Sequence, residues 1–90
     1  MNCLVLKVSP VKGTTLFYIK NDKEEFTKEL TPGSNMVECL NTLFENKQVE
    51  KIDKIIFYGH SVWIQHQLDK YNFSQYTKLK NIPIEIQPIN

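Results

Sequence analysis

The stretch that decides the fold is residues 54–61, which read KIIFYGHS. Lys54–Tyr58 is short and apolar on both faces, which is typical of a central parallel strand. Gly59 ends this run, and a helical pattern follows from Val62 to about Tyr71. A helix that leads to a parallel strand predicts a right-handed crossover connection.

Three further strands are predicted before this unit. Their ranges are Cys3–Val8, Thr14–Lys20 and Glu24–Leu30, and turn residues separate them. The third range alternates between two faces, with Phe26, Lys28 and Leu30 on one and Glu25, Thr27 and Glu29 on the other, as a half-exposed edge strand does. The first third of the chain therefore predicts an antiparallel meander.

A helix and a last strand complete the pattern. Ser34 or Asn35 can cap the helix by accepting hydrogen bonds from its first free amides. Its apolar positions, at helical spacing, are Met36, Val37, Leu40, Leu43 and Phe44. The polar residues 46–53 end this helix, and Ile82–Ile86, with prolines near both ends, predicts an outer strand. The predicted fold class is α/β (mixed α+β): one domain over residues 1–90, with a five-stranded mixed sheet in the order β-β-β-α-β-α-β.

The composition is that of an ordinary globular protein, with 41% hydrophobic and 23% charged residues. The net charge is +1 and all eleven basic residues are lysine, so the chain has neither a strong attraction to nucleic acid nor a guanidinium group to read bases. Cys3 and Cys39 lie in apolar periodic segments, which indicates reduced, buried thiols. No apolar stretch approaches the roughly 20 residues that span a bilayer, so we expect a cytoplasmic protein without membrane contact.

The element order resembles that of the ribonuclease H-like superfamily, and two segments sharpen the resemblance. In that family the first helix opens with an Asn, then a Met or Ala, then a metal-binding Glu; residues 33–40 here read GSNMVECL. The family's fourth strand ends in Asp-Ser, and residues 57–64 here read FYGHSVWI. The resemblance places Glu38 at the helix glutamate and Ser61 at the serine, with His60 where the family has its aspartate.

The departures from the family pattern argue against catalysis. The family's first strand carries an aspartate that bridges two magnesium ions, and Cys3–Ser9 contains none. The chain also stops shortly after its last predicted strand, before the family's terminal helix and its carboxylate. Two-metal hydrolysis needs several oxygen ligands that hold the ions about 4 Å apart. We therefore expect no enzyme, no metal and no cofactor; Glu38 and His60 are the only catalytic candidates.

The topology predicts one uncovered face of the sheet. Both crossovers step in the same direction with the same hand, so both helices are expected on one face. The inner strands are apolar on both sides, and in the family the terminal helix covers the second face. One set of apolar side chains is thus left without a partner inside the chain, which usually marks a binding surface. We expect this face to close a homodimer or to dock on another protein.

Aromatic side chains supply a second candidate surface. Trp63 lies about 100° around the second helix from its apolar stripe, and Tyr71, Phe73 and Tyr76 follow it. Large aromatic residues are enriched at interface hot spots, so these four are the predicted partner-binding residues. Packing of Trp63 under a neighbouring loop is the alternative explanation.

Three functional hypotheses follow from the sequence. The first is a non-catalytic protein-interaction module, in one specific form a phage or mobile-element inhibitor of a larger defence protein. The second is nucleic-acid binding without cleavage, and its candidate phosphate contacts are Lys7, Lys12, Lys20, Lys28 and Lys54. The third is a residual metal-dependent nuclease that uses Glu38 and His60.

Overall fold

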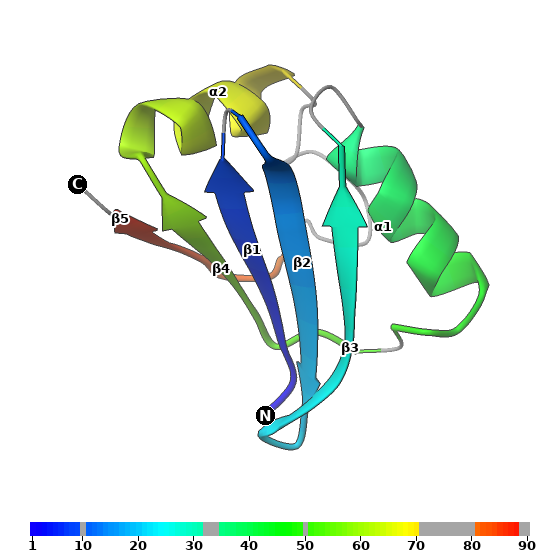
Figure 1. Cartoon of the computed structure of the whole chain (residues 1–90). Helices are drawn as coiled ribbons and strands as arrows, with labels where there is room; N and C mark the ends of the chain where they lie inside the picture. The colour runs from blue at the N-terminus through cyan, green and yellow to red at the C-terminus, as the bar shows by residue number, and fades with distance from the viewer. Residues whose placement is uncertain (10, 32–34, 50, 71–80, 89–90) are drawn as a thin grey trace.

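A computed structural model describes residues 1–9, 11–31, 35–49, 51–70 and 81–88. Its elements, in chain order, are β1 (Cys3–Ser9), β2 (Gly13–Lys20), β3 (Lys23–Leu30), α1 (Met36–Glu45), β4 (Lys54–Gly59), α2 (Ser61–Lys70) and β5 (Ile84–Pro88). The five strands form one sheet in the order β3-β2-β1-β4-β5 (Figure 1). The predicted element order and the mixed five-stranded sheet are confirmed.

The centre of the sheet is β1, which pairs antiparallel with β2 and parallel with β4. Leu6 stands opposite Leu16 on one side and Phe57 on the other. The outer pairs are antiparallel β2–β3 and parallel β4–β5. The KIIFYG segment is therefore an inner parallel strand, because its uninterrupted apolar run can meet packed neighbours on both sides.

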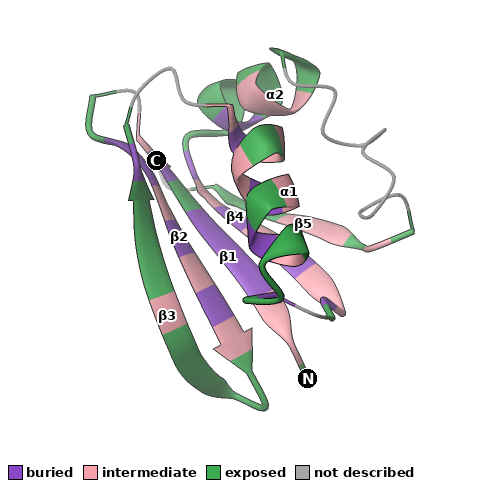
Figure 2. Ribbon diagram, turned by 90° about the vertical axis from the view of Figure 1, so that its right-hand side faces the viewer, coloured by how far each residue is buried: buried purple, intermediate pink, exposed green. Residues whose placement is uncertain are grey.

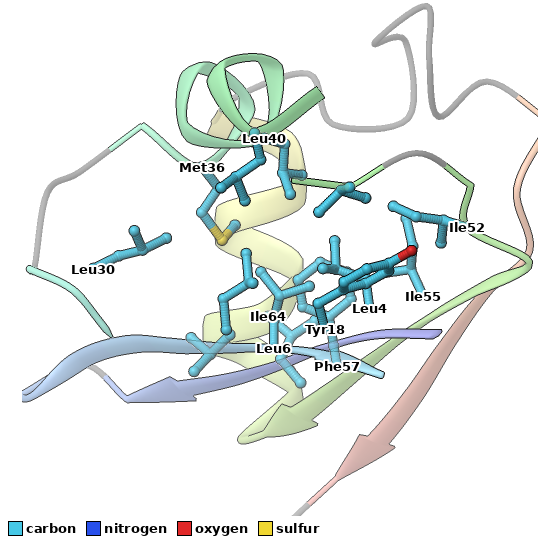
Figure 3. Packing of buried hydrophobic residues seen from close by; sticks show 14 residues of the cluster. Leu4, Leu6, Tyr18, Leu30, Met36, Leu40, Ile52, Ile55, Phe57 and Ile64 are labelled. Carbon is cyan, nitrogen blue, oxygen red and sulfur yellow. The ribbon is translucent and has the colours of Figure 1, made fainter. Parts of the chain in front are cut away.

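Both helices lie on the same side of the sheet, as Figure 2 shows, and this too was predicted. Between helices and sheet lies a single apolar cluster, whose side chains project from β1, β2 and β4 toward α1 and α2 (Figure 3). Its fully inaccessible members are Leu4, Leu6, Leu16, Leu40, Ile55, Phe57 and Ile64. Burial of each such side chain stabilises the fold by about 1.5–3 kcal/mol, so this cluster is the main source of stability.

Helix α1 is capped at both ends by local hydrogen bonds. The side-chain oxygen of Asn35 accepts from the amides of Val37 at 2.9 Å and Glu38 at 3.3 Å, so Asn35 is the N-cap, one of the two candidates that the sequence offers. At the other end Lys47 adopts a φ of 59° and its amide donates to the Phe44 carbonyl, while the next amide donates to the Leu43 carbonyl. This is a Schellman motif that has lysine where glycine is usual.

The sequence predicts a polar connection between α1 and β4, but the structure buries two of its residues. Val49 and Ile52 are buried, at 1% and 7% exposure, and both belong to the core cluster. The Tyr18 hydroxyl donates to the Lys51 carbonyl at 3.2 Å, which holds the same connection against β2. Two isolated apolar residues have no periodicity, so the sequence pattern does not reveal that they are core.

The last strand begins two residues later than predicted, at Ile84. Proline has no amide hydrogen, but the Pro83 carbonyl still accepts a hydrogen bond from the Ile55 amide at 2.9 Å.

Within the described part of the chain, no helix is both long enough and apolar enough to cross a membrane.

Candidate functional site

The candidate site is the side of the sheet that faces away from the helices, here called the reverse face. Side chains alternate along a strand, so the residues between the core positions of the three inner strands point to this side. They are Cys3, Val5 and Lys7 of β1, Thr15, Phe17 and Ile19 of β2, and Lys54, Ile56 and Tyr58 of β4. No described helix lies over this side of the sheet (Figure 1).

The centre of the reverse face is apolar. Val5 stands between Phe17 of β2 and Ile56 of β4 in the strand register. These neighbours screen Val5 to 8% exposure even though it lies outside the core cluster, while Phe17 and Ile56 themselves are half-buried. Half-buried apolar side chains that adjoin one another are what an exposed binding patch requires, in contrast to isolated apolar residues, which are common on any surface.

A charged rim surrounds this apolar centre. On the β3 side, Glu24 stands opposite Ile19 and Glu29 opposite Thr15, and both carboxylates are exposed. On the β5 side, Lys54 and Glu85 form an ion pair with 3.0 Å between Nζ and Oε2. Hydrogen bonds from Lys54 and Gln87 hold the pKa of the Glu85 carboxyl below its ordinary value. The reverse face therefore has an acidic edge along β3 and the Lys54–Glu85 ion pair on the other side of its apolar centre.

An open hollow of about 520 Å³ occupies part of the reverse face. Its lining residues are Val5, Lys7, Phe17, Ile19, Glu24 and Tyr58. The ammonium of Lys7 lies 5.1 Å from the centroid of the Phe17 ring, within cation–π range. The hollow thus combines an aromatic and aliphatic floor with one positive and one negative side chain, which suits a protein side chain better than a small ligand that needs enclosure.

The two free edges of the sheet carry features that discourage strand addition. At the β3 edge, Lys28 lies on the same face as Phe26 and Leu30, so a charge points inward beside the core. At the other edge, β5 is five residues long and ends at Pro88, which offers no amide hydrogen. Inward charges, short strands and prolines are the usual protection of sheet edges. Strand addition at either described edge of the sheet is therefore disfavoured.

The two catalytic candidates lie in different surroundings. Glu38 is exposed in the first turn of α1 and lines a groove of about 490 Å³ between α1 and β3, together with Cys39 and Thr42. His60 is exposed between β4 and α2, and its backbone carbonyl accepts the first α2 hydrogen bond from Ile64. The lining of the groove, as far as the described residues show it, does not include His60. In the same described residues, no three His, Cys, Asp or Glu side chains gather where they could hold a metal ion.

The structure describes only one of the four predicted aromatic partner-binding residues, Trp63. Trp63 is 43% exposed on α2 and its neighbour Val62 is 66% exposed, so α2 presents apolar surface to solvent. Tyr71, Phe73 and Tyr76 lie outside the described residues. Trp63 therefore stays a partner-binding candidate, and its contact with the other three stays a prediction.

The lysines proposed as phosphate contacts do not share one surface. Lys7 and Lys54 point to the reverse face, whereas Lys28 points to the helix side. Strand register places Glu24 and Glu29 on the same face as the first two lysines, and Glu24 lines the hollow together with Lys7. Phosphate binding needs a continuous positive surface, and this arrangement interrupts it.

The two cysteine thiols are less buried than the sequence predicts. Cys3 and Cys39 are both free and half-buried. Cys3 lies on the reverse face and Cys39 lines the groove beside α1. Strand alternation around Cys3 and the groove along α1 explain the partial exposure, since neither residue points to the centre of the core.

Sequence reasoning recognised two apolar sets on the inner strands but did not say which set meets the helices. It named Lys7 and Lys54 only as candidate phosphate contacts and did not name Glu24 or Glu29. The two-residue alternation along each strand indicates which side chains share a face. Which residues lie side by side across the strands depends on strand register, which pairs residues far apart in the chain.

No protein-family model matches the chain, and comparison with curated proteins finds no match either.

Proposed function

We propose that this protein is a non-catalytic protein-interaction module that binds its partner through the reverse face. The observation that carries the proposal is the apolar centre formed by Val5, Phe17 and Ile56, which no described element of the chain covers. Contiguous apolar surface of this kind is costly in water and gains free energy when another protein covers it.

The ribonuclease H-like ancestry and the role as an inhibitor of a larger defence protein belong to the same proposal. The strand order β3-β2-β1-β4-β5 and the Asn35 cap three residues before Glu38 agree with the resemblance. The groove that Glu38 lines does not include His60 among its described residues, which supports a fold used for binding, because an acid–base or metal mechanism requires its groups to converge on one atom.

The test compares three tagged forms of the chain, expressed in the cells that produce it. Ile56→Asp places a charge in the centre of the reverse face, and Gln65→Asp places the same charge on the exposed side of α2 as a matched control. Circular dichroism and thermal unfolding first establish that all three forms are folded. We expect one specific protein, or an untagged copy of the chain, to be recovered with the wild type and Gln65→Asp and to be absent with Ile56→Asp.

Two results would contradict the proposal. Recovery of the same proteins with all three forms would move binding away from the reverse face. Recovery of nucleic acid in place of protein, lost between low and moderate salt, would favour the nucleic-acid alternative. A nuclease would be revealed by metal-dependent cleavage that Glu38→Ala and His60→Ala each abolish without unfolding the chain.

A further inference from the structure

We draw no further inference here: the strongest candidate, the open hollow on the reverse face whose lining includes the oppositely charged Lys7 and Glu24, belongs to the apolar face already described, and nothing in the described residues shows what covers it.

Discussion

Replacement of Gly59 by alanine tests how closely β1 and β4 approach at the end of the sheet. Gly59 has a φ of 146°, a conformation that side chains disfavour. A Cβ atom added to Gly59 would lie 2.7 Å from the Val8 carbonyl oxygen and 3.5 Å from the Val8 Cβ. The first of these contacts is shorter than any that a Cβ atom normally makes, and it involves backbone, so a strand must move to relieve it.

The expected loss of stability can be estimated from these two effects. A residue held in such a disfavoured conformation costs about 1–3 kcal/mol. Displacement of β1 adds to this cost, so we expect the free energy of unfolding to fall by about 3 kcal/mol, a large share of the roughly 5–13 kcal/mol typical of a domain of this size. Since the unfolding entropy is about 2.1 cal/mol/K per residue, the Tm should fall by about 15 °C.

The measurement is thermal unfolding followed by circular dichroism, with urea unfolding at 25 °C as a second determination. His60→Ala is the control, because His60 is the next residue, is exposed, and should change the free energy of unfolding by less than about 0.5 kcal/mol. If Gly59→Ala unfolds within about 3 °C of the wild type, the backbone conformation or the approach of β4 to Val8 is not as described.

Three further predictions concern the ends of α1 and the ion pair at the edge of the reverse face. Lys47→Gly should raise the free energy of unfolding by about 1 kcal/mol in urea unfolding, because glycine adopts the positive φ of Lys47 without strain. Asn35→Ala should lower it by about 1 kcal/mol, since two amides of the first turn lose their acceptor; Asn35→Ser should retain most of the stability. The pKa of Glu85 is lower in the folded chain than in the unfolded chain, so its pairing with Lys54 stabilises the fold above the ordinary carboxyl pKa. That contribution should disappear as the pH falls through the lowered pKa. Lys54→Met should therefore flatten the acid side of a plot of stability against pH, and an unchanged slope would contradict this assignment.

Local residue patterns were enough to predict the elements of this protein. The two-residue alternation of β3 and the helical spacing from Met36 to Phe44 each depend on near neighbours in the chain, so they can be read without a structure. The position of both helices on one face also followed, because the hand of parallel crossovers is nearly invariant. The cap was narrowed to Ser34 or Asn35, since capping involves only the next three residues, and the structure selects Asn35.

Tertiary structure decided which residues form the core and the site. Val49 and Ile52 stand in a polar segment without periodicity, and only packing against the sheet makes them core residues. Strand register places Glu24, Ile19, Cys3 and Lys54 in one row across the reverse face, although these residues are far apart in the chain. Register depends on side-chain packing across several strands at once, and it is this non-local free energy, absent from any short stretch of sequence, that gives the reverse face its order of charges.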